Sequence, residues 1–203
     1  MQKKEFDKII EKFFNEKDIL STESFYLFIN RKKIIAFVPQ SHIEMLTMKM
    51  SAAGAGLIGN YEMCSFRTKG TGTFKPNEKA KPFSGKKNRI SYEEEIKLEM
   101  ECDTGSLNNV INALLKFHPY EEVAYEIYDF KKRDNKSEGY TVTFKSKQTI
   151  NREESKAKSY AVEFKKLVVI NSKTDNNILE SAKYLNCDGI LIIFKKNYKF
   201  IPI

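Results

Sequence analysis

Hydrophobic residues along this chain recur with two different periods, which predicts that helices and strands follow one another. The first such segment has its apolar residues at helical spacing: Phe6, Ile9, Ile10, Phe13 and Phe14. This spacing predicts one amphipathic helix that packs on the domain or on a partner chain. "FYLFI" (25–29) then predicts a short strand. Residues 1–32 are therefore expected to form a helix and a strand against the core.

The next segment reads as strand, helix, strand. "KIIAFVP" (33–39) predicts a buried strand. Ser41 and Glu44 have the spacing of a capping box, which predicts a helix that runs to Ala53 and ends at Gly54. The aromatic, alternating "NYEMCSFRT" (60–68) predicts a strand.

The segment after it contains a long loop and a second strand–helix–strand pattern. Glycines and prolines from Gly70 onwards predict a loop over 67–90, a length typical of a functional or interface loop. "EEEIKLEMEC" (93–102) alternates as a strand, and Asp103 or Ser106 is expected to cap the following helix. That helix should stop at Pro119, and "EVAYEIYDF" (122–130) should form the closing strand. Residues 33–130 thus predict a ferredoxin-like βαββαβ domain.

The last part of the chain predicts a small parallel unit behind a linker. The polar "KKRDNKSEG" (131–139) is the expected linker. Within 140–203, "YTVTF" (140–144) predicts a strand and residues 151–160 a polar helix. The apolar strands "KKLVVINS" (165–172) and "GILIIF" (189–194) flank a helix, and this pattern indicates a βαβ unit with a parallel, covered sheet. The fold class is accordingly mixed, α+β with an α/β element.

Composition narrows the classes of function. The net charge is +8, but only five of the 35 basic residues are arginines, the better readers of phosphates and bases. No specific nucleic-acid binding is therefore expected, and no apolar run reaches membrane-span length. Three scattered cysteines, Cys64, Cys102 and Cys187, predict reduced thiols and a cytoplasmic location.

Two patterns in the sequence suggest chemistry, and each also has a simpler structural explanation. Gly54, Gly56 and Gly59 have the spacing of a dinucleotide fingerprint, but they follow a helix instead of a strand, so no cofactor is predicted. His118 precedes Glu121 and Glu122, which suggests a metal ligand or general base. Adjacent carboxylates on a strand point to opposite faces, so His118 and Glu122 are only weak metal candidates. The alternative is a histidine that ends its helix.

Six stretches, in order, resemble a known family: "FVPQSHIEML", "AAGAGLIGNYEMCSF", "GTGTFKP", "PFSG", "EEIKLEM" and "HPYEEVAYEIY". Together they are similar to the insert domain of the Nif-three-like family, the GTP cyclohydrolase I type 2 homologues. "HPYE" also resembles CutA proteins. The resemblance implies a CutA/PII-like domain over 33–130 and a remnant of the family core in "KKLVVINSKTDNNILESAKYLNCDGILIIF" (165–194).

The same resemblance implies a departure from the family. Its two-metal centre takes ligands from an N-terminal half and from C-terminal residues for which this sequence shows no counterpart. We therefore expect a non-catalytic, homo-oligomeric binding or regulatory module that takes a protein partner or a small ligand. The alternatives are a metal-dependent hydrolase completed across subunits and a CutA-like trimeric metal or stress-response protein. The candidate ligand or interface residues are Gly54, Gly56, Gly59, Asn60, Tyr61, Cys64, Ser65, Gly70, Gly72, Phe74, His118, Tyr120, Glu121 and Glu122.

Overall fold

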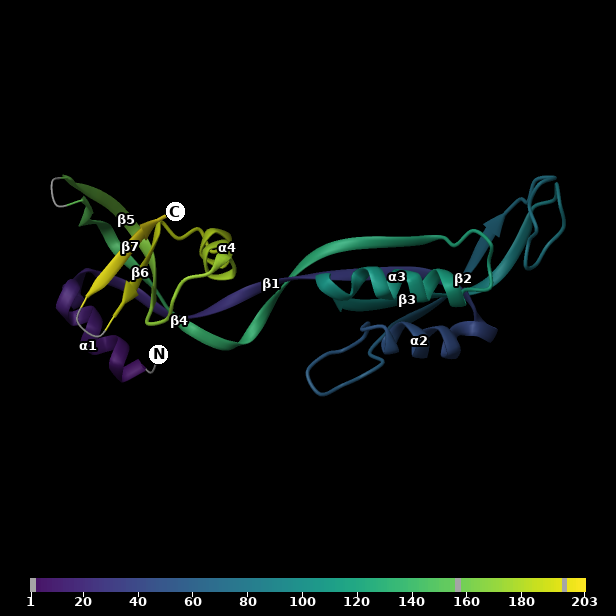
Figure 1. Ribbon diagram of the computed structural model, residues 1–203, viewed down its shortest axis with the longest axis horizontal. Coiled ribbons are helices and arrows are strands. Elements are labelled where there is room, and N and C mark those ends of the chain that lie inside the picture. The colour runs from purple at the N-terminus through teal and green to yellow at the C-terminus, as the bar shows by residue number, and fades with distance from the viewer. Residues whose placement is uncertain (1–2, 156–157, 195–196) are drawn as a thin grey trace. The chain divides into compact units, whose positions relative to one another are not determined.

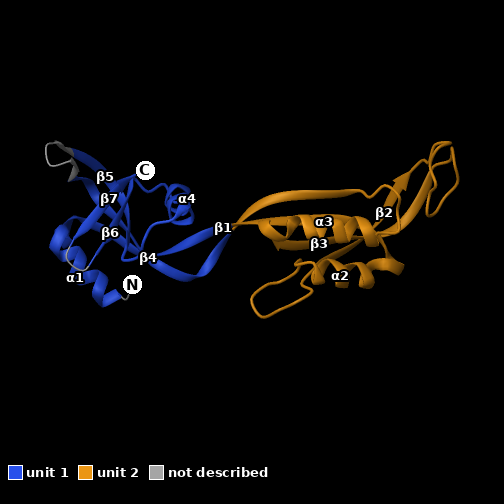
Figure 2. Cartoon of the chain, viewed as in Figure 1, with its two compact units in different colours: residues 1–29, 132–203 blue, residues 30–131 orange. Residues whose placement is uncertain are grey.

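The computed structural model describes residues 3–155, 158–194 and 197–203 (Figure 1). The protein has a mixed α+β fold with seven strands in the order β2-β3-β1-β4-β5-β6-β7. It divides into two compact units, unit 1 of residues 1–29 with 132–203 and unit 2 of residues 30–131 (Figure 2). Strands β1 (Ile19–Pro39) and β4 (Tyr125–Ser155) contribute to both. Among the described helices, none is long and apolar enough to cross a membrane.

Unit 2 contains the second half of β1, the start of β4 and four further elements. These are α2 (Ile43–Ala52), β2 (Phe66–Phe74), β3 (Ser91–Asp103) and α3 (Leu107–Phe117). Strand β3 pairs antiparallel with β1 on one side and with β2 on the other, and β2 ends the strand order. The chain order of this unit is therefore β-α-β-β-α-β.

The core of unit 2 lies between its sheet and its two helices. Every second residue of β3 is buried there, from Ile96 to Cys102, and every second residue of β1 from Ile34 to Val38 joins them. The helices contribute Leu46, Met50, Val110 and Leu114. Alternation of this kind leaves the intervening side chains of β3 on the opposite face of the sheet. These side chains are charged and half-buried: Glu93, Glu95, Lys97 and Glu99.

Unit 1 is built around strand β5 (Lys158–Ile170), which is covered on both faces. Leu167 and Val169 pack in a cluster with helix α1 (Lys3–Phe13). Val168 and Ile170 pack in a second cluster with helix α4 (Asn176–Tyr184). Strand β6 (Gly189–Ile193) pairs parallel with β5, and β7 (Tyr198–Pro202) pairs antiparallel with β6. The unbroken apolar run in β5 follows from these two buried faces.

Three segments that the sequence pattern does not predict as strand belong to strands. The strand predicted at 25–29 and the one at 33–39 are a single strand, β1. The polar stretch 131–139, expected to be a linker, lies inside β4. The helix expected over 151–160 is wrong for the described residues, which belong to β4 as far as Ser155 and to β5 from Lys158. Backbone pairing in exposed strands needs no apolar pattern, so polar sequence was an unreliable guide here.

The region around α2 and β2 also differs in detail. Gly70 and Gly72 lie within β2, paired with Glu95 and Glu93, so the loop between β2 and β3 spans only 75–90. Helix α2 begins without a side-chain cap, because Ser41 lies in a preceding 3₁₀ turn and Glu44 pairs instead with Arg67. Neither Asp103 nor Ser106 caps α3 through its side chain.

Candidate functional site

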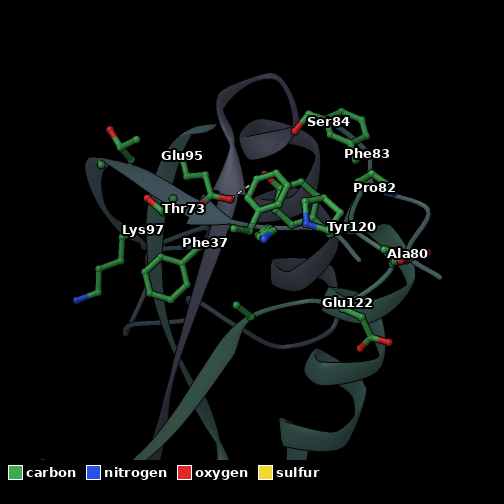
Figure 3. Close-up of a pocket in the computed structure, with 18 of the residues that line it drawn as sticks. Phe37, Thr73, Ala80, Pro82, Phe83, Ser84, Glu95, Lys97, Tyr120 and Glu122 are labelled. Carbon is green, nitrogen blue, oxygen red and sulfur yellow. Dashed lines mark hydrogen bonds between the residues drawn. The ribbon is translucent and has the colours of Figure 1, made fainter. Parts of the chain in front are cut away.

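A cavity of about 630 Å³ lies entirely within unit 2 (Figure 3). One wall is the run 68–76, which comprises most of β2 and the two residues after it. The loop 75–90 contributes a second wall, and the segment 120–124 after α3 contributes a third. Phe37 of β1 and Glu95 and Lys97 of β3 complete the lining.

Two glycines of β2 leave room for this cavity. Gly70 and Gly72 are two residues apart, so they face the same side of the strand. A side chain at Gly70 would meet nothing within 4 Å. A side chain at Gly72 would collide with the carboxylate of Glu95, which lies across that position. Small residues at both positions therefore keep the cavity open and let Glu95 extend along its wall.

Tyr120 and Glu95 form the central polar contact of the cavity. The hydroxyl of Tyr120 donates a hydrogen bond to Oε1 of Glu95 at 2.7 Å. Burial, and then the hydrogen bond and the negative charge of Glu95, raise the pKa of Tyr120 far above its usual value. Tyr120 is therefore a neutral donor at physiological pH. Its ring also contacts Phe83, with the ring centres 5.8 Å apart.

His118 lies directly behind Tyr120 and supports it. The backbone N–H of Tyr120 donates to Nδ1 of His118 at 3.1 Å, so Nε2 carries the ring proton and donates to the carbonyl of Phe37 at 3.0 Å. Burial lowers the pKa of His118, which favours this neutral form. Both ring nitrogens are occupied by the main chain. The geometry corresponds to the structural reading of "HPYEE" and gives His118 no free nitrogen for a metal.

The loop over the cavity is fastened by carboxylates. The backbone N–H of Lys81 donates to Oε1 of Glu121 at 2.8 Å, and the hydroxyl of Ser84 donates to Oε2 of Glu93 at 2.7 Å. Phe83 packs between His42 and Tyr120. Glu121 thus positions the loop, whereas Glu122 is an exposed lining residue. Among the described residues, no three His, Cys, Asp or Glu side chains are grouped so as to hold a metal ion.

The structure brings together six of the candidate residues in the cavity lining: Gly70, Gly72, Phe74, Tyr120, Glu121 and Glu122. His118 lies behind them. The others occupy the turn after α2, away from the lining: Gly54, Gly56, Gly59, Asn60, Tyr61, Cys64 and Ser65.

In that turn the three glycines have positive φ angles. Gly56 is the tightest of them, because its N–H donates to the carbonyl of Glu101 at 2.7 Å and its carbonyl accepts from Cys64 at 2.9 Å. The glycines therefore serve a sharp turn between helix and strand.

Among the lining residues that are not in the candidate set are Phe37, Phe83, Glu95 and Lys97. The alternation of "EEEIKLEMEC" contained a signal for two of these four, Glu95 and Lys97. It placed Glu95 and Lys97 together on the face opposite the apolar residues. Phe83 and Phe37 carried no such signal, because a loop aromatic and a strand aromatic each have ordinary structural roles.

Comparison with known proteins gives sequence relatives for part of the chain. No family model matches it. A GTP cyclohydrolase 1 type 2 homolog of Halalkalibacterium halodurans is 45% identical over 108 residues, which are 53% of this chain and 27% of that protein. The corresponding protein of Bacillus subtilis is 39% identical over 120 residues, 59% of this chain and 32% of that protein. The chain thus spans about a third of the length of these curated relatives.

Among solved structures, a Bacillus cereus protein related to NIF3 is similar with a TM-score of 0.48 and 26% identity, over 91% of this chain and 51% of that one. The periplasmic divalent cation tolerance protein CutA of Archaeoglobus fulgidus is similar over 48% of this chain and 81% of that one. Its TM-score is 0.36 and its identity 11%. The sequence relatives confirm the resemblance found in the motifs: over about half of its length, this chain is a homologue of the GTP cyclohydrolase 1 type 2 homologs of the NIF3 family.

Proposed function

We propose that this chain acts as a binding module of a NIF3-type protein, with a small organic molecule bound in the cavity of unit 2. The cavity itself is the observation that supports this role. Its volume of about 630 Å³ falls within the range of small-molecule sites, roughly 300–1,000 Å³. It also combines apolar walls with a few fixed polar groups, chiefly the hydrogen-bonded pair of Tyr120 and Glu95.

We further propose that unit 2 is a ferredoxin-like domain whose role is non-catalytic. The chain order β-α-β-β-α-β and the strand order β2-β3-β1-β4 support the first part. The second part is supported by His118, which the main chain holds neutral behind the cavity instead of leaving it free to exchange protons with a ligand.

A substitution that fills the cavity tests the binding role. Gly70→Leu places a side chain where nothing lies within 4 Å, and its backbone needs no positive φ, so the strand should form normally. Gly105→Leu is the matched control, since Gly105 also has open space around it but lies outside the cavity. A fragment library is screened by amide NMR on the full chain and both variants.

Fragments should shift the amides of 68–76 and 120–124 in the wild type and in Gly105→Leu, and these shifts should disappear in Gly70→Leu. Fragments that shift the same amides equally in Gly70→Leu would contradict the proposal. The proposal would also be contradicted if no compound of the library shifted the amides of 68–76 and 120–124.

We also propose that the chain self-associates through exposed apolar side chains at the start of β4. Tyr125, Ile127 and Tyr128 are 37%, 42% and 52% exposed. Tyr125 and Ile127 are two residues apart and face the same side of β4, whereas Tyr128 faces the other side, so apolar surface is exposed on both sides of this strand, and exposed apolar surface can mark an interaction site. Analytical ultracentrifugation should show an oligomer that Ile127→Glu dissociates, and a wild-type monomer would exclude this surface as a self-association site.

A further inference from the structure

The two carboxylates on the cavity side of β3 have neutral partners. Glu95 accepts from the hydroxyl of Tyr120, and Glu93, two residues earlier, accepts from the hydroxyl of Ser84. Both glutamates are half-buried. Among the described residues, neither forms an ion pair with a lysine, arginine or histidine. Each carboxylate accepts one hydrogen bond from these neutral hydroxyls and keeps acceptor capacity for a cation, which would form a stronger, charge-assisted hydrogen bond.

The lysines near the cavity do not supply a cation for Glu93 and Glu95. The ammonium group of Lys97 lies 2.9 Å from Oε1 of Glu99, which raises the pKa of Lys97 through that hydrogen bond. Glu99 also pairs with Lys33 at 3.2 Å, so these two lysines are both held at Glu99, and neither forms an ion pair with Glu93 or Glu95 among the described residues. The other two lysines of the lining, Lys69 and Lys75, are exposed to solvent, where their fields are screened. The sheltered part of the cavity thus has an excess of negative charge.

The same part of the cavity has aromatic walls. Phe37, Phe74 and Tyr120 are half-buried lining residues, and Phe83 extends from the loop toward Tyr120 (Figure 3). The faces of aromatic rings attract cations and pack well against flat apolar groups. Carboxylates and aromatic faces together favour a cationic ligand over neutral and anionic ligands.

We infer that the ligand of this cavity is a small organic cation with a flat apolar body, such as an aryl amidinium or aryl ammonium compound. This inference rests on the proposed binding function. The cationic N–H groups would donate to Glu95, on the oxygen that Tyr120 does not occupy, while the ring would lie among Phe37, Phe74 and Phe83. Charge-assisted hydrogen bonds of this kind are roughly twice as strong as neutral ones.

Three probes of nearly equal shape test the inference: benzamidine, benzamide and benzoate, which carry positive, neutral and negative charge. Each is titrated into the full chain and followed by amide NMR. Benzamidine should bind about tenfold more tightly than benzamide, the gain expected from one charge-assisted hydrogen bond with a cation–π contact. Benzoate should bind more weakly than either.

Glu95→Gln identifies the residue responsible. Glutamine keeps a side-chain oxygen for the Tyr120 hydroxyl but has no charge, so the preference for benzamidine over benzamide should disappear while benzamide binding stays the same. Glu62→Gln is the control, because it removes the same charge from an exposed residue of unit 2 outside the lining. It should leave the preference unchanged.

The outcomes separate this inference from the proposal on which it rests. If benzamide or benzoate binds as tightly as benzamidine and Gly70→Leu abolishes that binding, the cavity is a ligand site and the cation inference is wrong. A preference that survives in Glu95→Gln also overturns the inference. Calcium chloride that displaces benzamidine and shifts the amides of Glu93 and Glu95 would show an inorganic cation site instead. If no probe and no library fragment reaches the cavity, the proposed function fails with it.

Discussion

His118 is held by the main chain on both sides of its ring. The Tyr120 N–H can only donate, so the acceptor role of Nδ1 and the donor role of Nε2 are fixed by partners that cannot change with pH. Protonation would cost the hydrogen bond at Nδ1 and would place a charge on a buried ring. A residue that looks suited to chemistry in the sequence thus positions Tyr120 and Phe37 at the cavity wall.

This arrangement predicts a pH-dependent stability. Burial lowers the folded-state pKa of His118 below its unfolded value of about 6.5. The stabilisation from the neutral ring is therefore complete above about pH 6.5 and is lost as the pH falls through the folded-state pKa. Wild type should lose more free energy of unfolding than His118→Gln between about pH 7.5 and pH 5, measured by urea denaturation. His42→Gln, at a half-buried histidine, should lose nearly as much as wild type, because the charge of His42 is the smallest of the causes that act on the pKa of His118. Equal losses in all three proteins would refute the assignment.

At the scale of elements, strand β5 connects two helices to one sheet. Its alternate side chains belong to different clusters, with α1 on one face and α4 on the other. Helix α1 is held chiefly by its two buried residues, Phe6 and Ile10, and the ring of its half-buried Phe13 contacts Tyr198. A short amphipathic helix is stable only when its apolar face is packed. The helix and the sheet of unit 1 are therefore expected to depend on each other.

Truncation of Phe6 should show this dependence. Phe6 is 1% exposed and its ring contacts Tyr140 with centres 4.4 Å apart. Phe6→Ala should lower the free energy of unfolding of unit 1 by about 3–5 kcal/mol, the usual cost of removing a buried phenylalanine. Phe13→Ala, at a half-buried position of the same helix, should cost clearly less. Hydrogen exchange of the β5 amides measures the loss of unfolding free energy in both variants. Equal losses would show that Phe6 is not the main contact between α1 and the sheet.

Elements with a buried face were predictable from the sequence. The apolar period located α2, α3, β3 and the β5-α4-β6 unit, because each hides one stripe or one face from water. The polar residues 131–139 predict a linker but lie in β4, because the pairing of this strand relies on backbone hydrogen bonds that leave no side-chain pattern. The same limit applied to the cavity. Gly70 and Tyr120 were noticed as unusual residues, whereas Glu95 resembled any charge on the outer face of a strand.

For the whole molecule, the division into units predicts that residues 30–131 fold alone. The buried cluster of this unit lies wholly within it, from Ile34 to Leu114, as does the complete cavity lining. The two ends of the segment are adjacent, with Nζ of Lys131 3.1 Å from Oδ1 of Asn30. An excised 30–131 fragment should therefore give the amide NMR spectrum of unit 2 in the full chain. A collapsed spectrum without dispersion would show that unit 2 requires residues outside these limits.

The interruption of unit 1 by unit 2 has a consequence for synthesis on the ribosome. Residues 1–29 emerge before 30–131, but the strands that complete their sheet lie in 132–203 and emerge only after all of 30–131. The chain of unit 2 is thus complete before that of unit 1, and domains generally fold as units while the rest is still being made. Once folded, unit 2 holds Asn30 and Lys131 side by side. The folding of unit 1 then no longer bears the entropic cost of closing a loop of about 100 residues between its two segments. The inserted unit then serves as a template that brings the two halves of unit 1 together.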